Sequence, residues 1–169
     1  MIFSRKKIII CNAKNSRGFG IVEIIVALSV MVLALSGVVT AVGLSLRAVK
    51  ETTRKTQAAY LLEETLEAVK HLRDQSWNTH ITSLTINTEY YLDFTGGHWE
   101  VITASVPVSG IFTRSFRLEN VLRDSNDDIA STGTLDPDTK KLIATVTWTT
   151  PTVTASESAS TYITNLFGD

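Results

Sequence analysis

One carboxylate stands near the start of a long apolar run. Glu23 is the only charged residue between Phe19 and Leu46. A carboxylate in this position of a membrane helix is costly unless it reaches the interface or finds a partner. A plain membrane anchor would let Glu23 extend toward the headgroups. The alternative is a carboxylate that binds a cation supplied by another group.

The residues before Glu23 favour the second interpretation. Residues 16–23 read Ser-Arg-Gly-Phe-Gly-Ile-Val-Glu. This segment resembles the leader motif of type IV prepilins, in which a basic residue and Gly are followed by Phe, with Glu as the fifth residue after the cut. The resemblance implies that prepilin peptidase cleaves between Gly18 and Phe19 on the cytoplasmic side, and that the new amine of Phe19 is methylated. The apolar run would then be kept in the mature chain.

The spacing of the motif suggests a role for the carboxylate. Glu23 lies four residues after Phe19, which is about one helical turn. Proteins similar to this one are thought to pair the carboxylate with the N-terminal amine of a neighbouring subunit. Inside an apolar helix bundle such a pair fixes the register, whereas an unpaired carboxylate is costly. We therefore expect Glu23 to set the assembly register.

The chain also departs from the prepilin pattern. Gly20 stands where many members of the family have Thr or Ser, and the apolar helix contains no Pro. Gly37 and Gly43 could soften the helix or allow close helix packing. These differences favour a minor pilin or a pseudopilin over a major pilus subunit.

Two other groups of side chains could bind a metal. Glu67 and His71 have the i, i+4 spacing of helical ligands. Since no second ligand cluster accompanies them, a solvated helix face is the favoured interpretation.

The second group is an acidic loop, in which Asp124, Asn126 and Asp128 place oxygen atoms at alternate positions, as in the start of an EF-hand. Ile129 stands where that loop needs Gly, and Leu135 where it needs Glu. A plain acidic turn is therefore favoured, and the three residues remain a weak calcium candidate.

The sequence contains no recognisable catalytic constellation. Its three histidines are scattered without a zinc-protease motif, and no phosphate-binding Gly-rich loop follows a strand. Residues 76–169 hold five basic and eleven acidic side chains, which disfavours nucleic-acid binding. We predict no enzymatic activity, no cofactor and no nucleic-acid partner.

The elements that position Glu23 follow from the hydropathy pattern. Residues 24–46 carry no charge and are long enough to span a bilayer. The basic residues upstream predict a cytoplasmic N-terminus, with the remainder outside. From residue 47 to about 76 the helix continues with an apolar stripe that includes Ala58, Val69 and Leu72.

The remainder of the chain predicts a β-rich head. Candidate strands cover residues 90–94, 99–106, 112–122, 141–149 and 161–167. Residues 95–98 are predicted to be a hairpin connection, and residues 107–110 and 136–138 to be turns. A small antiparallel sheet packed on the amphipathic half of the helix would bury both apolar faces. The fold class is therefore α+β, with a long N-terminal helix on a small antiparallel sheet, which is also the architecture that the resemblance implies.

Cysteine usage adds a further constraint. Cys11 is the only cysteine, so no intramolecular disulfide can form. A lipoprotein site at Cys11 is disfavoured, because the preceding isoleucines lack the small-residue pattern.

The sequence predicts four segments: a basic leader (1–18), a transmembrane and filament-core helix (19–46), its amphipathic continuation (47–76) and an exported head (77–169). The expected function is that of a structural subunit of a type IV pilus-like filament. Expected partners are prepilin peptidase, other pilin subunits, an inner-membrane assembly platform and membrane lipid. A minor pseudopilin of a type II secretion system and a bitopic membrane-anchored binding protein remain as alternatives. The expected location is the bacterial cell membrane, with the head outside, followed by a surface or periplasmic filament.

Overall fold

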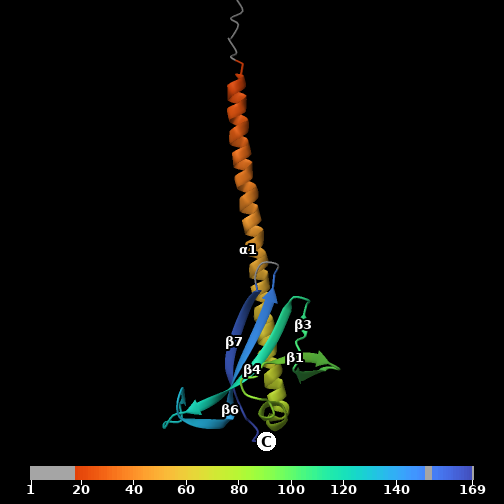
Figure 1. Ribbon diagram of the computed structural model, residues 1–169, viewed down its shortest axis with the longest axis vertical. Helices are drawn as coiled ribbons and strands as arrows, with labels where there is room; N and C mark the ends of the chain where they lie inside the picture. The colour runs from red at the N-terminus through yellow and green to blue at the C-terminus, as the bar shows by residue number, and fades with distance from the viewer. Residues whose placement is uncertain (1–17, 151–153, 169) are drawn as a thin grey trace, which may run out of the picture. The chain divides into compact units, whose positions relative to one another are not determined.

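The computed structural model describes residues 18–150 and 154–168 (Figure 1). The predicted leader, apart from Gly18, lies outside the described residues, as does Cys11. The elements, in chain order, are α1 (Ile21–Gln75), a π-helical turn η1 (Asn78–Thr82), β1 (Tyr90–Thr95), β2 (His98–Ile102), β3 (Pro107–Val108), β4 (Phe112–Arg123), β5 (Ile129–Ala130), β6 (Thr134–Thr149) and β7 (Thr154–Thr164).

The chain divides into two compact units, Met1–Ala48 and Val49–Asp169. In the first unit the described structure is the N-terminal part of α1. From Ile21 to Ala48 this part rises about 40 Å at 1.5 Å per residue, which exceeds the hydrocarbon thickness of a bilayer, about 30 Å. The helix begins two residues later than the predicted cleavage site and ends at Gln75, as the pattern indicated.

The second unit is an antiparallel sheet packed on the C-terminal part of α1. The main strand order is β2-β1-β4-β6-β7, and the short strands β3 and β5 both pair with β4. All of the strand pairs are antiparallel. Figure 1 shows β4, β6 and β7 running alongside this part of the helix. The predicted α+β class and the packing of the sheet on the helix are confirmed.

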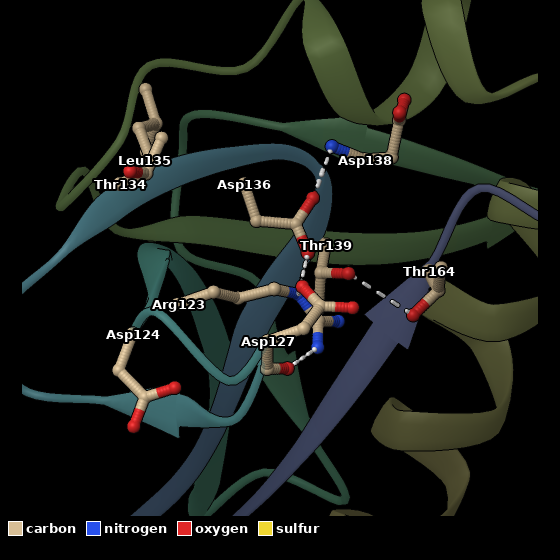
Figure 2. Close-up of a pocket in the computed structure, with 9 residues that line it drawn as sticks. All are labelled: Arg123, Asp124, Asp127, Thr134, Leu135, Asp136, Asp138, Thr139 and Thr164. Atoms are coloured by element: carbon tan, nitrogen blue, oxygen red, sulfur yellow. Dashed lines mark hydrogen bonds and ion pairs between the residues drawn. The ribbon is translucent and has the colours of Figure 1, made fainter.

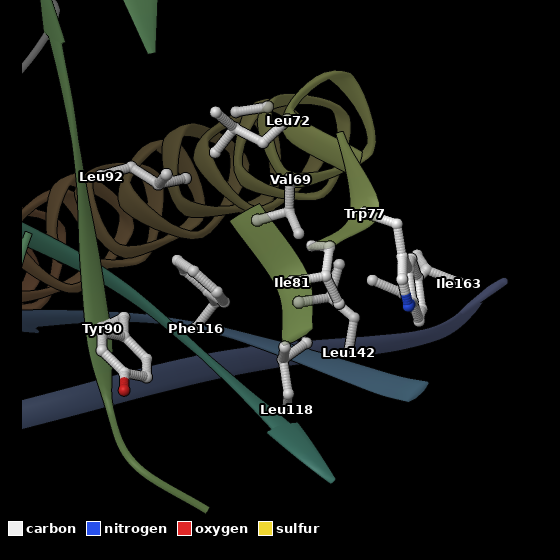
Figure 3. Packing of buried hydrophobic residues seen from close by; sticks show 11 residues of the cluster. Val69, Leu72, Trp77, Ile81, Tyr90, Leu92, Phe116, Leu118, Leu142 and Ile163 are labelled. Carbon is white, nitrogen blue, oxygen red and sulfur yellow. The ribbon is translucent and has the colours of Figure 1, made fainter. Parts of the chain in front are cut away.

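Two adjoining clusters form the core of the second unit. The helix contributes residues that are buried at three- and four-residue steps: Ala58, Leu62, Thr65, Val69 and Leu72. The sheet contributes the alternate residues Phe116 and Leu118 of β4, among others. The larger cluster contains Ala68, Val69, Leu72, Trp77, Ile81, Tyr90, Leu92, Phe116, Leu118, Leu142 and Ile163, and most of its side chains are labelled in Figure 3.

The hairpin prediction at Thr95–His98 is confirmed. Thr95 pairs with His98. Gly96 and Gly97 have φ values of 65° and 85°, the left-handed conformations that a two-residue hairpin turn requires. The tight connection fixes the register of β1 and β2, so that Phe94 pairs with Trp99.

The predicted turn at residues 136–138 is wrong. These residues lie inside β6, where the register on β4 shifts: Asn120 pairs with Lys140, but Val121 pairs with Asp136. The segment is therefore a bulge, and a bulge tolerates Pro137 because the ladder loses its regular hydrogen bonds there. The predicted strand 99–106 is also shorter than expected, because β2 ends at Ile102 and β3 begins at Pro107.

Candidate functional site

The start of α1 carries the residues of the predicted processing site. Gly18, Phe19 and Gly20 precede the helix. The carbonyl of Gly20 accepts hydrogen bonds from the N–H groups of Glu23, at 3.0 Å, and Ile24, at 3.3 Å. Glu23 thus lies in the first turn, where the positive end of the helix dipole favours a carboxylate.

The side chain of Glu23 is exposed and has no partner among the described residues. Within the part of the chain that the structure describes, its carboxylate makes no hydrogen bond or ion pair. A carboxylate of this kind is well solvated in water, but in an apolar environment it requires a cation or a hydrogen-bond donor. If the helix inserts into such an environment, the partner of Glu23 must come from outside the described chain.

The glycines around the predicted cut are not explained by contacts with the described residues. None of the atoms in residues 18–150 and 154–168 lies within 4 Å of the place where a Cβ would stand on Gly18 or on Gly20. Gly37 and Gly43, within α1, also face open space. The described contacts therefore place no steric requirement for glycine at these four positions.

The first unit exposes its apolar side chains. From Phe19 to Leu46 the large apolar side chains are between 51% and 79% exposed. Such a continuous apolar surface is far larger than soluble monomers present to water. Such a surface is suited to contact with lipid or with neighbouring helices.

Three hydroxyl groups of this helix, those of Ser29, Ser36 and Thr40, bond to backbone carbonyls of the helix itself. Ser29 donates to the carbonyl of Ile25 at 2.8 Å, and Thr40 donates to that of Ser36 at 2.9 Å. Ser36 donates to the carbonyl of Val32. This pattern lets a serine or threonine enter an apolar environment without an unsatisfied donor.

Among the described residues, α1 is the one helix that is long and apolar enough to cross a membrane. This agrees with a membrane-anchored protein.

The acidic loop lies at the β4–β5 connection. The Oδ1 atom of Asp124 accepts hydrogen bonds from the N–H groups of Asn126, at 2.8 Å, and Asp128, at 3.1 Å. Asp127 has a φ of 67°. The calcium candidates therefore belong to a turn in which one carboxylate satisfies backbone donors.

Figure 2 shows that the positively charged side chain of Arg123 lies beside this loop. Nε of Arg123 donates to Oδ2 of Asp136 at 2.6 Å, and Nη1 donates to the carbonyl of Asp127 at 2.7 Å. The hydrogen bond from Arg123 holds the pKa of the Asp136 carboxyl below its ordinary value of 3.8. The same contact raises the pKa of the Arg123 guanidinium, which is thus a permanent positive charge at this site.

The helical pair Glu67 and His71 does not converge on a common point. Glu67 forms an ion pair with Lys70 at 2.8 Å, and the ring of His71 contacts Gln75 at 3.1 Å. No group of three or more His, Cys, Asp or Glu side chains in residues 18–150 and 154–168 is arranged to hold a metal.

Sequence reasoning missed a buried cluster at the helix–sheet boundary. Nη1 of Arg114, on β4, donates to Oε2 of Glu64, on α1, at 2.7 Å. The Arg114 guanidinium also lies 4.7 Å from the ring centroid of Trp99, on β2. Arg114 lies on the same face of β4 as Phe112 and Phe116. This position on the apolar face was the signal in the sequence from which the burial of its side chain could have been predicted.

Comparison of the chain with protein-family models, with curated protein sequences and with solved structures finds no match in any of the three.

Proposed function

We propose that this chain is a structural subunit of a type IV pilus-like filament, of the minor-pilin kind, that is cut by prepilin peptidase and N-methylated at Phe19. The observation that carries the proposal is the carboxylate of Glu23. It stands in the first turn of a helix that exposes its apolar side chains, and it has no partner in the described chain. The Gly18–Phe19 step lies one helical turn before it.

The helix surface supports assembly by side-to-side packing. Ser29, Ser36 and Thr40 bond to the helix itself, and Gly37 and Gly43 leave open space that a close neighbour could fill. In such a bundle Glu23 pairs with the Phe19 amine of an adjacent subunit, because each charge removes the desolvation cost of the other. The exported head is then carried on the surface of the filament.

The experiment that tests the proposal replaces Glu23 by Val. We expect processing at Gly18 to survive, because cleavage precedes assembly. The replacement leaves the ammonium of Phe19 without its partner, at a cost of about 3 kcal/mol, so incorporation into fibres should fall at least tenfold. The measurement is the amount of cleaved protein in sheared surface fibres relative to membranes.

A matched control is Glu63→Val, which removes an exposed carboxylate further along α1. This variant should enter fibres as the unmodified chain does. Equal incorporation of the Glu23→Val and wild-type chains would remove Glu23 from the mechanism and favour a membrane-anchored binding protein. A pseudopilin of a type II secretion system would show the same processing and the same dependence on Glu23, but no surface fibre at normal expression.

A further inference from the structure

The strand β7 stands at one end of the main strand order, so only one of its two edges is paired (Figure 1). It has 11 residues and keeps an unbroken register with β6 along its whole length. The strand at the opposite end of the order, β2, has five residues. An unpaired edge presents a row of backbone N–H and C=O groups to which another extended chain can bind. We call the unpaired side of β7 the β7 edge.

The register shows which backbone groups point out of the β7 edge. The N–H group of Asn165 donates to the carbonyl of Asp138 at 2.8 Å. Alternate residues of an antiparallel pair exchange such bonds, so the odd-numbered residues of β7 bond to β6. The even-numbered residues direct their N–H and C=O groups away from β6, and among the described residues these groups have no hydrogen-bond partner. These residues are Thr154, Ser156, Ser158, Ser160, Tyr162 and Thr164.

The β7 edge lacks the features that usually prevent strand addition. Proteins protect long edge strands with Lys, Pro or a β-bulge. The strand β7 contains no Lys, Arg or Pro, and its pairing with β6 has no register shift. Its one charged residue, Glu157, forms an ion pair with Lys55 of α1 at 3.8 Å, which offsets the charge. The edge therefore offers about five pairs of free backbone groups in a regular row.

The helix side of the β7 edge determines which side chains an added strand should carry. Ala155 and Ala159 are partly buried and pack on the smaller core cluster, and Leu66 of α1 is partly buried beside both clusters. Small side chains at an edge leave room for larger ones on the next strand. The pairing on the other side of β7 illustrates this, since Trp148 of β6 stands opposite Ala155. An added strand should therefore carry apolar side chains at every second position.

A second folded copy of the chain does not supply a matching strand. The edge strands of its main strand order are β2, which is short, and β7 itself. Every strand pair of the described sheet is antiparallel. Figure 1 shows β7 alongside the C-terminal part of α1, so antiparallel pairing of two β7 strands would run the two α1 helices in opposite directions. Two such helices could not cross one membrane in the same sense.

We propose that the β7 edge binds an extended, uncharged segment of another protein by antiparallel strand addition. The backbone of the segment bonds to the even-numbered residues of β7, and its apolar side chains lie opposite Ala155 and Ala159. The proposal assumes that α1 anchors the chain in a membrane, but it does not depend on assembly into a filament.

The probe for the test is a synthetic peptide with the sequence of residues 140–149, which alternates apolar and polar side chains and carries two lysines for solubility. The full chain is labelled with nitrogen-15 in a zwitterionic detergent, and amide hydrogen exchange is measured with and without the peptide. At saturation we expect exchange at Ser158 and Ser160 to slow by about tenfold or more, because their N–H groups become bonded. The amides of Glu157 and Ala159 are already bonded to β6 and should not change.

A substitution at the β7 edge provides the first specificity test. Ser158→Pro removes an N–H group that points out of the edge but no bond to β6, a change that edge strands tolerate. It should weaken peptide binding about tenfold. Ser158→Ala is the matched control, because it removes only the hydroxyl group, and it should bind the peptide as the unmodified chain does.

The second specificity test leaves the protein unchanged. An added strand bonds through only one of its own edges, so N-methylation of one alternate set of peptide residues should abolish binding. Methylation of the other set should leave binding intact. A peptide of the same composition in scrambled order, without the alternation, should bind at least about tenfold more weakly.

Three outcomes would overturn the proposal. In the first, the peptide at millimolar concentration protects none of the even-numbered amides of β7. In the second, the scrambled peptide or both methylated peptides protect them as well as the original does. In the third, these amides are already protected without peptide and the chain is a dimer, which would assign the β7 edge to a second copy.

Discussion

At the scale of single residues, the head is organised around two arginines with different surroundings. The side chain of Arg114 is 8% exposed, and its partner Glu64 is 47% exposed. The Nε atom of Arg114 is buried without a hydrogen-bond partner among the described residues. Arg123 is 30% exposed and binds an Asp136 side chain that is 13% exposed. Arg114 therefore depends on its few contacts within the protein, whereas water can replace part of the hydrogen bonding of Arg123.

The asymmetry between Arg114 and Glu64 leads to a first prediction. Glu64→Ala leaves a buried guanidinium without its carboxylate, and should cost about 2 kcal/mol of unfolding free energy. Arg114→Met leaves Glu64 free to be hydrated and fills the site with an apolar chain, so it should cost less than about 1 kcal/mol. Urea unfolding in one detergent, followed by the fluorescence of the buried tryptophans, measures both. A larger loss in Arg114→Met than in Glu64→Ala would contradict this description of the cluster.

Asp136 leads to a second prediction, on acid stability. Its pKa is lowered in the folded chain by Arg123. The contact therefore contributes its full stabilisation above the ordinary pKa of 3.8, and the contribution is lost as the pH falls through the lower folded value. Asp136→Asn should make the chain less stable at neutral pH and should flatten the fall in stability below about pH 4.

The measurement for Asp136 is the urea midpoint as a function of pH. Asp138→Asn is the control, since this exposed carboxylate has no ion pair in the described structure. If Asp136→Asn kept the same acid dependence as the unmodified chain, Arg123 would not be the source of the effect.

At the scale of elements, the helix and the sheet each bury one face against the other. Ala58 and Leu62 of α1 pack with Phe112, Val146 and Trp148. Neither surface could remain in water without its partner, because both are continuous and apolar.

This mutual burial gives a third prediction. A fragment of residues 52–169 should be soluble, monomeric and cooperatively folded without a disulfide. A fragment of residues 77–169 lacks the helical cover and should aggregate. Size-exclusion chromatography and thermal unfolding distinguish the two fragments. A soluble and cooperative sheet without the helix would show that the core does not need α1.

The sequence predicted the elements whose patterns report burial directly. The spacing of Ala58, Val69 and Leu72 predicted the helix face, and the alternation around Phe116 predicted β4. The first part of β6 was missed, because Asp136, Pro137 and Asp138 have turn chemistry and the bulge that accepts them is set by pairing with β4.

The start of β7 was missed for a different reason. Residues 154–160 read Thr-Ala-Ser-Glu-Ser-Ala-Ser, without alternating apolar side chains. These residues are strand because they pair residue by residue with β6, from Thr154 with Thr149 to Ser160 with Ile143. The contacts of Arg114 could not be predicted from the sequence either, since Glu64 is fifty residues away along the chain.

At the scale of the whole molecule, the two parts of the chain have surfaces suited to different environments, one apolar and one aqueous. One stretch exposes apolar side chains and bonds three of its hydroxyl groups to its own backbone, and the other has a closed core and an excess of acidic residues. This division follows directly from the distribution of charge along the sequence. The predicted processing site lies at the start of the apolar stretch, where the described structure begins.

The last prediction concerns this processing site. Among the described residues, no atom stands within 4 Å of a Cβ added to Gly18 or to Gly20, so the described structure leaves room for alanine at both positions. If a peptidase reads Gly18 in a pocket that accepts little beyond hydrogen, Gly18→Ala should be cut poorly and a larger residue should block cutting. Gly20→Ala is the matched control, equally open and only two residues away, and its cleavage should continue.

Mass spectrometry of the protein recovered from fibres should show a chain that begins at methylated Phe19. Recovery of the intact chain from Met1 in assembled fibres, or equal cleavage of Gly18→Ala and the unmodified chain, would mean that residues 16–23 are not a processing signal. The helix would then serve as a plain membrane anchor for the head.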